Sequence, residues 1–316
     1  MLAATARGAA VAPTTGTITI PTPTITIVRE QHNSRGVSNL RTMFDFQTIT
    51  NRNINPIGLV PLRASASSDF NKQGLKTVLQ RIDTVCVRNE LRKPTVLVLD
   101  LREESHGYFN DGELFSWMTE HDWGNKGFTQ EQALARESLL LGETPLLGHA
   151  MFCDDPSYKS DRVTLRPLIV TNTMTEKQLV EQAGVRYARI PVTDNLRPSD
   201  CNVDQFIQLA RQLPANTWIH FHCKAGTGRA MTFAILWDIL HNGDQLALAD
   251  ITRRQAQLLD GVTDLLKVNP KSAEWERKAG QERADFLRTF YEYAKTKPLE
   301  SSGPMWTDWL NSRPAR

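Results

Sequence analysis

Apolar residues recur at helical or strand spacing along most of the chain after residue 70. The run 72–86 is apolar on one helical face, which predicts an amphipathic helix capped by Asn71 or Asp69. Short apolar runs predict buried strands at 94–101, 164–172, 185–192 and 216–223. Helical spacing is found at 129–141, 175–184, 201–214, 229–243 and 272–295. Because strands and helices alternate, we expect an α/β core with a mostly parallel central sheet flanked by helices.

Two segments depart from this alternation. Residues 102–165 are rich in Gly, Trp, Asp and Pro, and they predict a small subdomain inserted into a domain that spans 36–316. Residues 1–35 are rich in Ala, Thr and Pro, lack a 7–15-residue apolar core, and predict a disordered or targeting tail rather than a cleaved secretory signal. The repeated "TITI" in this tail would also suit an edge strand.

Composition narrows the functional classes. The 316 residues are 40% hydrophobic and 23% charged, with 37 basic and 35 acidic side chains and a net charge of +2, so we expect no nucleic-acid partner. No apolar run reaches the roughly 18–20 residues of a membrane span. The four cysteines are scattered and form no CxxC pair, which argues against a zinc site. They could pair into two disulfides, but a chain of this size does not need them and one cysteine looks reactive, so reduced thiols are favoured. We expect no metal and no cofactor.

The stretch "HFHCKAGTGRA", residues 220–230, joins a predicted strand to a predicted helix. Its two glycines permit a tight turn and close approach of a ligand to the backbone. A loop that closes onto a helix N-terminus directs N–H groups inward, binds anions, and favours the thiolate form of a cysteine at its centre. Arg229 would hold two phosphate oxygens with its planar fork. The pattern therefore predicts that Cys223 is a nucleophile toward phosphorus, rather than a structural thiol.

Such a reaction needs a general acid for the leaving oxygen. Asp194 lies in "PVTDNLRP", directly after the predicted strand 185–192 and one helix and one strand before Cys223. Adjacent parallel strands end at the same sheet edge, so this carboxyl is placed to approach the thiol. A capping role in the turn is the alternative for Asp194, and the partnership with Cys223 favours the acid.

"HCKAGTGR" resembles the signature of the protein tyrosine phosphatase superfamily. Longer stretches resemble the cysteine phytases, the protein-tyrosine-phosphatase-like (PTP-like) inositol polyphosphatases of bacteria. They are "NLRT" (39–42), "LRASASSDF" (62–70), "LDLREESHGYFNDG" (99–112), "HDWGNKG" (121–127), "AGVRYARIPVTDNLRP" (183–198), "LPANTWIHFHCKAGTGR" (213–229), "DITRRQAQLLDG" (250–261) and "PMWTDWL" (304–310). "DLREESHG" and "HDWGNKG" separate this branch from ordinary tyrosine phosphatases.

The resemblance implies a PTP-like core with a small partial β-barrel built from the insertion. It implies metal-independent, stepwise hydrolysis of inositol hexakisphosphate through a phosphocysteine. The catalytic residues would be Cys223, Arg229 and Asp194, with His222 in support. Substrate contacts are expected from the loop, from "NLRT" and from a C-terminal lysine-bearing segment, namely from Arg41, Lys224, Ala225, Gly226, Thr227, Gly228, Asn195, Lys267, Lys271 and Lys278. A solvated helix face is the alternative for the last three.

Three positions depart from the family's pattern. Lys224 replaces an acidic residue and should add positive potential beside the phosphate. Asn195 replaces a histidine, which would alter phosphate contacts. Ala230 replaces a Ser or Thr whose hydroxyl stabilises the departing thiolate, so we expect slow phosphoenzyme hydrolysis. Thr232 stands too far along the helix to substitute.

Several other polar and aromatic residues are expected to have structural roles. Asp100 ends a buried strand, where bonding to nearby backbone amides is the leading interpretation, and Arg102 is either structural or a substrate contact. His106 has no ligand partner at metal spacing in the sequence. Trp117 and Trp123 are expected in a subdomain core rather than in a ligand platform.

Three functions remain open at this point. An inositol polyphosphate phosphatase leads, a protein tyrosine phosphatase effector is the second, and an inactive inositol phosphate-binding module is the third. We expect a small-molecule inositol polyphosphate as substrate and a monomer or weak dimer. A bacterial protein, secreted or translocated into a host cell, is the expected setting; a soluble cytoplasmic or periplasmic protein is the alternative.

Overall fold

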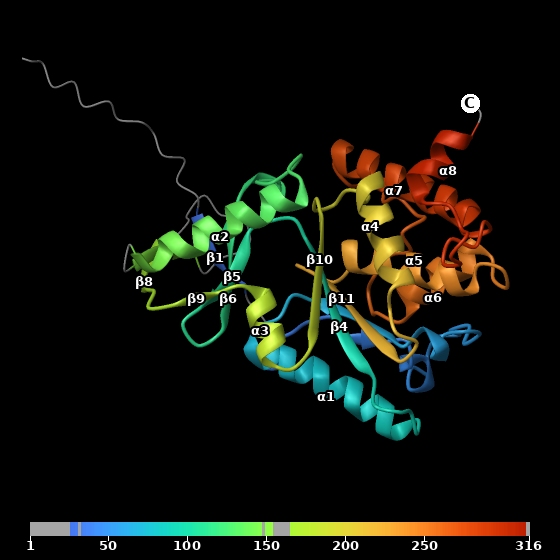
Figure 1. The fold of residues 1–316 in the computed structure, drawn as a ribbon, viewed down its shortest axis with the longest axis horizontal. Helices are drawn as coiled ribbons and strands as arrows, with labels where there is room; N and C mark the ends of the chain where they lie inside the picture. The colour runs from blue at the N-terminus through green and yellow to red at the C-terminus, as the bar shows by residue number, and fades with distance from the viewer. Residues whose placement is uncertain (1–25, 31–32, 147–148, 154–164, 314–316) are drawn as a thin grey trace, which may run out of the picture.

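A five-stranded sheet forms the centre of the fold (Figure 1). The computed structural model describes residues 26–30, 33–146, 149–153 and 165–313. The strand order is β10 (Arg186–Val192), β4 (Thr95–Arg102), β11 (Thr217–Cys223), β3 (Ala64–Ser68) and β2 (Arg41–Thr42). The first four strands are parallel, and only β2 pairs antiparallel with its neighbour. The predicted α/β fold with a mostly parallel central sheet is confirmed.

Helices cover both faces of this sheet, because side chains alternate along each strand. Leu97, Leu99 and Leu101 of β4 pack on one face, in a core shared with the C-terminal helices. Val98 points to the other face, where two helices pack. The first group is α4 (Asp200–Arg211), α5 (Arg229–Asn242), α6 (Leu248–Gln257), α7 (Glu274–Ala294) and α8 (Trp306–Ser312), and the second is α1 (Lys72–Arg88) and α3 (Glu176–Gln182).

Local capping residues begin several of these helices. The Asn71 side chain accepts a hydrogen bond from the Gly74 N–H at 2.9 Å, so the cap predicted for α1 is confirmed. Thr175 and Ser199 form capping boxes at the starts of α3 and α4. The strongly apolar α5 is buried along nearly its whole length, which explains its apolar residues on every side.

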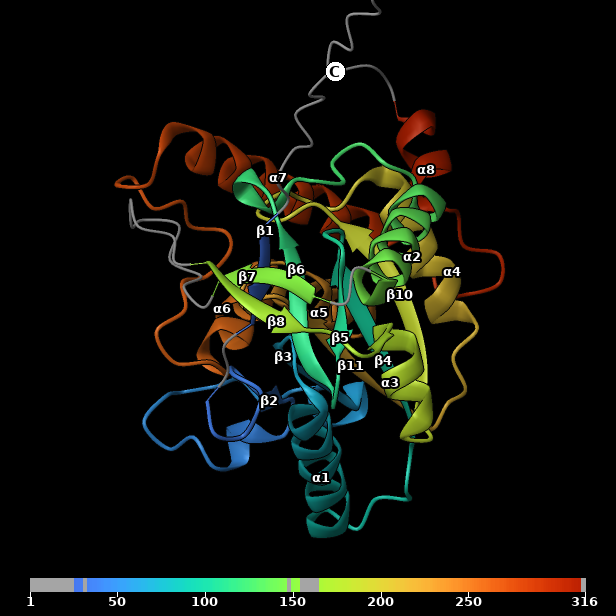
Figure 2. The same cartoon turned by 90° about the vertical axis from the view of Figure 1, so that its left-hand side faces the viewer.

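A second, six-stranded sheet curls into a half-barrel beside the first (Figure 2). Its core contains Phe109, Phe115 and Leu141, the last contributed by α2 (Gln130–Leu146). Its strand order is β8 (Leu165–Ile169), β7 (His149–Cys153), β1 (Thr26–Arg29), β6 (Glu113–Met118), β5 (His106–Phe109) and β9 (Thr173–Met174). Short 3-10 turns are η1 (Asp45–Gln47), η2 (Val60–Leu62) and η3 (Glu120–Asp122).

This second sheet corrects two sequence predictions. Residues 26–29, assigned to the tail, form β1, and this strand lies inside the sheet between β6 and β7 rather than at an edge. The run 164–172 was expected among the alternating strands of the core, but its strand β8 pairs antiparallel with β7. The half-barrel therefore draws strands from outside 102–165 as well. The predicted tail over residues 1–25 lies outside the described residues.

Two further properties bear on the setting of the protein. Cys86, Cys201 and Cys223 are free thiols, in agreement with the expected reduced state. Among the described helices, none is both long and apolar enough to cross a membrane.

Candidate active site

Cys223 ends β11 and faces a tight loop that closes onto α5. The thiol is 2% exposed, and the backbone N–H of Gly226 donates to its sulfur at 3.2 Å. Gly226 has φ +77°, and a Cβ there would lie 2.4 Å from the Ser67 carbonyl carbon, so only glycine fits. The sequence-predicted nucleophile thus sits in a cradle of backbone groups at the sheet's carboxyl edge.

Two side chains from outside the nucleophile loop donate hydrogen bonds to its backbone carbonyls. Asn39 Nδ2 donates to the Ala225 carbonyl at 2.8 Å, and Arg41 Nη2 donates to the Gly226 carbonyl at 2.9 Å. With these carbonyls turned outward, the adjacent N–H groups are left to face the anion position. Gly228 then forms the N-cap of α5, and the helix dipole points at the loop.

Arg41 lies behind the nucleophile loop, and its contact with a substrate phosphate stays a prediction. Its side chain is 1% exposed and bonds the backbone of Asn39 and Gly226. Burial lowers the pKa of Arg41 to about 10, and the neighbouring Cys223 opposes this shift. Arg41 therefore places a positive charge behind the nucleophile loop and supports the loop backbone.

Arg229, the predicted phosphate clamp, forms a bidentate ion pair with Glu104. Its Nη1 and Nη2 donate to the two carboxylate oxygens of Glu104 at 2.5 and 2.8 Å. Arg102 Nε donates to the same carboxylate at 2.9 Å, so this buried Arg102 serves structure rather than substrate. Burial opposes ionisation of Glu104, but Arg229 and Arg102 hold its pKa well below the usual range. The carboxylate thereby fixes the orientation of the Arg229 guanidinium.

Asp194 follows β10, and the structure brings it beside Arg229 as the sequence predicts. Its Oδ1 lies 3.1 Å from Arg229 Nη2, and its side chain is 26% exposed. Asn195, in the left-handed region with φ +63°, donates from Nδ2 to Asp194 Oδ2 at 2.9 Å. Asn195 therefore orients the carboxyl in this structure. The carboxyl has access to solvent and to the phosphate position, as a general acid requires.

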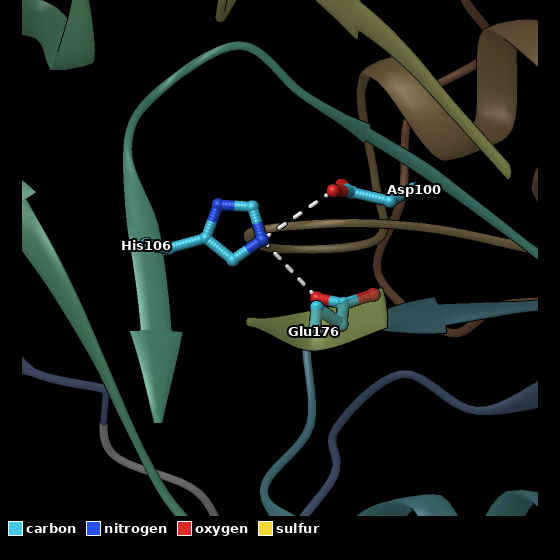
Figure 3. Close-up of side chains that lie close together, drawn as sticks. All are labelled: Asp100, His106 and Glu176. Atoms are coloured by element: carbon cyan, nitrogen blue, oxygen red, sulfur yellow. Dashed lines mark hydrogen bonds and ion pairs between the residues drawn. The ribbon is translucent and has the colours of Figure 1, made fainter. Parts of the chain in front are cut away.

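His222 precedes the nucleophile and belongs to a buried charged cluster. Its Nε2 lies 2.6 Å from Glu176 Oε1, although the two groups are not aligned for a linear hydrogen bond. Glu176 Oε2 lies 3.2 Å from His106 Nε2, which is 3.4 Å from Asp100 Oδ2 (Figure 3). Sequence reasoning missed Glu176, because only the fold brings the first turn of α3 under β11.

The triad Asp100, His106 and Glu176 is also the one described group with metal-binding spacing, with ligand atoms within 4.8 Å. Its carboxylates already have cationic neighbours, since Arg189 Nε lies 3.1 Å from Asp100 Oδ2. Burial opposes ionisation of Asp100, but Arg189 holds the pKa of this carboxyl well below its usual range. The donor set therefore fits an internal ion-pair centre better than a cation site. That the reaction needs no metal stays a prediction.

Asp100 also fulfils its predicted backbone role. Its Oδ1 accepts the Arg102 backbone N–H at 2.8 Å. Trp117 is buried in the half-barrel core, as expected. Trp123 departs from expectation, because its half-buried indole donates from Nε1 to the Asp194 carbonyl at 2.9 Å.

The predicted lysines have different surroundings from one another. Lys224 Nζ lies 2.8 Å from Asp122 and 3.7 Å from Glu30, so much of its expected positive potential is compensated. The C-terminal lysines are all exposed, and no described contact joins them to the nucleophile loop; they are Lys267, Lys271 and Lys278.

Arg283 on α7 is a candidate that sequence reasoning missed. A Cβ on Gly228 would lie 3.9 Å from Arg283 Nη1, which places the guanidinium beside the loop. Its Nε is buried and has no hydrogen-bond partner among the described residues. Burial lowers the pKa of Arg283, and Asp194 opposes the shift. Basic residues are common on amphipathic helices, so nothing in the local sequence around Arg283 predicts that it lies beside the nucleophile loop.

Ala230 is fully buried in the core that also holds Cys223. Thr232 Oγ1 donates to the Gly228 carbonyl at 3.0 Å. The Thr232 hydroxyl hydrogen is thus engaged one turn along α5, in agreement with the prediction that it does not replace the missing hydroxyl.

Comparison with known proteins places this geometry in context. Residues 99–241 match the profile of the PTP-like phytase family, described by the words "Inositol hexakisphosphate". The PTP-like phytase from Bdellovibrio bacteriovorus superposes with a TM-score of 0.69 and 31% identity, over 90% of this chain and 94% of that one. The PTP-like myo-inositol phosphatase from Mitsuokella multacida, in complex with myo-inositol-(1,3,4,5)-tetrakisphosphate, gives 0.79 and 29%, over 91% and 49%.

A curated relative adds a bacterial setting. The effector protein hopD2 of Pseudomonas syringae pv. tomato is 30% identical over 266 residues, which are 82% of this chain and 55% of that protein. The chain therefore spans about half the length of this effector and of the Mitsuokella protein. With the Bdellovibrio phytase matched over nearly its whole length, the chain belongs to the PTP-like phytase family.

Proposed function

We propose that this protein is an inositol polyphosphate phosphatase, which removes phosphates stepwise from inositol hexakisphosphate. The observation that carries the proposal is the gathering of cations around one thiol. Arg41 bonds the loop backbone, Arg229 follows the loop on Glu104, and Arg283 lies beside Gly228, whereas much of the charge of Lys224 is compensated by Asp122. The chain as a whole carries a net charge of only +2, so these cations are concentrated locally rather than spread over the surface. A ligand with several phosphates suits such a group of cations.

The proposed reaction has two steps. Cys223 Sγ attacks phosphorus, the P–S bond forms, and the P–O bond to the inositol oxygen breaks as Asp194 delivers its proton to that oxygen. Arg229 and the loop N–H groups hold the equatorial oxygens, where charge gathers in the transition state. Asp194 then takes a proton from water, the water oxygen bonds to phosphorus, and the thiolate leaves.

Ala230 makes the second step the slower one in this proposal. No hydroxyl stands at 230 to donate to the departing sulfur, and the Thr232 hydroxyl hydrogen is engaged elsewhere. Phosphoenzyme should therefore accumulate in the first turnover.

A protein tyrosine phosphatase effector is the second candidate. It is favoured by the similarity to the Pseudomonas effector, which extends over 82% of this chain. We also propose, on the same relationship, that this bacterial protein is delivered into host cells. The two candidates differ in the pocket they require: an inositol polyphosphate needs several Lys and Arg side chains around a broad pocket, whereas phosphotyrosine needs a narrow slot with an aromatic wall.

The decisive experiment offers inositol hexakisphosphate and phosphotyrosine peptides to the same protein and follows phosphate release and inositol products. We expect stepwise loss of phosphate from the inositol. Release from peptides alone would reject the phytase proposal in favour of the second candidate. Cys223→Ser is the control: it should abolish turnover, whereas an inositol phosphate-binding module would keep all of its function without the thiol.

A further inference from the structure

The segment 120–123 connects the two catalytic loops. His121 and Asp122 both adopt left-handed backbone angles, with φ of 56° and 59°. Such a conformation costs roughly 1 kcal/mol or more for each non-glycine residue, and it persists where surrounding contacts demand it. One such contact is visible on the nucleophile side, where Lys224 Nζ lies 2.8 Å from Asp122 Oδ2.

Trp123, the next residue, reaches the loop of the general acid. Its indole Nε1 donates to the backbone carbonyl of Asp194 itself, at 2.9 Å. The indole is packed from several sides, which fixes where this donor points. Lys126 Nζ lies 3.7 Å from the ring centroid, the His121 ring at 4.8 Å, and the edge-on Trp275 ring of α7 at 5.6 Å.

The acid loop needs such a support. Asp194 lies in a turn closed by the Leu196 N–H to Thr193 carbonyl bond, and its own side chain is partly exposed. A displacement of about 1 Å of a catalytic group can cost on the order of 100-fold in rate. A donor that grips the main chain of the acid restricts this displacement.

We propose that Trp123 is a positioning residue, which holds the Asp194 carboxyl beside Arg229 through the indole–carbonyl hydrogen bond. The inference rests on the proposed function only in taking Asp194 as the general acid. Asp122 ties the same short segment to the nucleophile loop, so segment 120–123 sets the spacing between acid and thiol. The role differs from the subdomain core that sequence reasoning assigned to Trp123.

The test uses leaving groups of different basicity. p-Nitrophenyl phosphate releases a phenolate stable enough to leave without a proton, whereas phenyl phosphate and inositol hexakisphosphate need the acid. In Trp123→Phe the aromatic packing stays and only the N–H donor is lost. We expect kcat/KM for phenyl phosphate to fall about 10- to 100-fold, within the range of general acid catalysis, and to change less than about threefold for p-nitrophenyl phosphate.

Two control variants are needed to interpret this result. Asp194→Asn gives the largest leaving-group selectivity that loss of the acid can produce. Trp117→Phe makes the same substitution in the half-barrel core, where a purely structural defect would lower both activities by the same factor. Equal losses on the two aryl phosphates in Trp123→Phe, or no loss on either, overturn the proposal.

A structural measurement keeps the test independent of substrate. A crystal structure of Trp123→Phe should show Asp194 displaced from Arg229 or spread over several positions. If Asp194 keeps its 3.1 Å contact with Arg229, the inference is wrong whatever the protein hydrolyses. Conversely, failure of inositol hexakisphosphate as a substrate would reject the proposed function without altering the aryl phosphate comparison.

Discussion

Loss of the proton held by buried His106 should make this protein less stable in mild alkali. The ring is fully buried, with Glu176 and Asp100 oxygens 3.2 and 3.4 Å from its Nε2 (Figure 3). A Glu137 oxygen lies 3.5 Å from its Nδ1. Burial and Arg102 act to lower the pKa of His106, but the surrounding carboxylates outweigh them and raise it to about 10. The folded protein therefore retains a proton here that the unfolded chain releases near pH 6.5.

The sign and size of the effect follow from linkage. A group whose pKa is raised on folding stabilises the protein fully below its unfolded pKa, and this stability is lost as pH rises through the folded pKa. The unfolding free energy then falls by up to about 1.4 kcal/mol for each pH unit between these values. From pH 7 to pH 9, His106 should contribute a loss of roughly 2–3 kcal/mol.

Urea unfolding at pH 7, 8 and 9 measures this contribution. We compare the wild-type protein with His106→Gln, which lacks the titrating group, and read the pH slope rather than the absolute stability. The variant should have a flatter slope by the amount given above. His241→Gln is the matched control, because burial lowers the pKa of His241 and it stays neutral over this range. Parallel slopes for wild type and His106→Gln would refute the reasoning.

Three further predictions concern the catalytic centre. Ala230→Ser restores a hydroxyl that can donate to the departing sulfur. A charge-assisted hydrogen bond of about 1.5–3 kcal/mol should speed phosphoenzyme hydrolysis roughly 10- to 100-fold. The burst should then disappear in rapid-quench assays, and an unchanged burst contradicts the role of this position. Glu104→Gln leaves Arg229 and Arg102 buried without their shared carboxylate, so urea unfolding should show a loss of about 3–5 kcal/mol; a loss below about 1 kcal/mol would exclude this dependence. Arg283→Met should raise KM for inositol hexakisphosphate about tenfold and leave p-nitrophenyl phosphate nearly unaffected, whereas equal effects on both would show that Arg283 contacts no peripheral phosphate.

The sequence by itself determined the elements whose signals are local. Helix α1 follows from its apolar spacing and its Asn71 cap, and the nucleophile loop follows from Cys223, its glycines and Arg229 within a few residues. Asp194 was also within reach, because the carboxyl ends of parallel strands lie at one edge of the sheet, although β4 separates β10 from β11 and the predicted adjacency of these two strands was wrong. Periodicity and short-range geometry are properties of neighbouring residues, so they are readable without the fold.

Only the tertiary structure decided what depends on distant pairing. Strand β1 pairs Ile27 with Trp117, and no periodicity within the first residues specifies a partner so far along the chain. The contact of Glu176 with His222 and the approach of Arg283 to the loop arise where separate elements pack together. Burial then shifts the pKa values of the groups that are brought together, as for Arg41 behind the thiol. Desolvation and ion pairing depend on which elements pack together, which is why the pKa shifts around Cys223 are visible only in the fold.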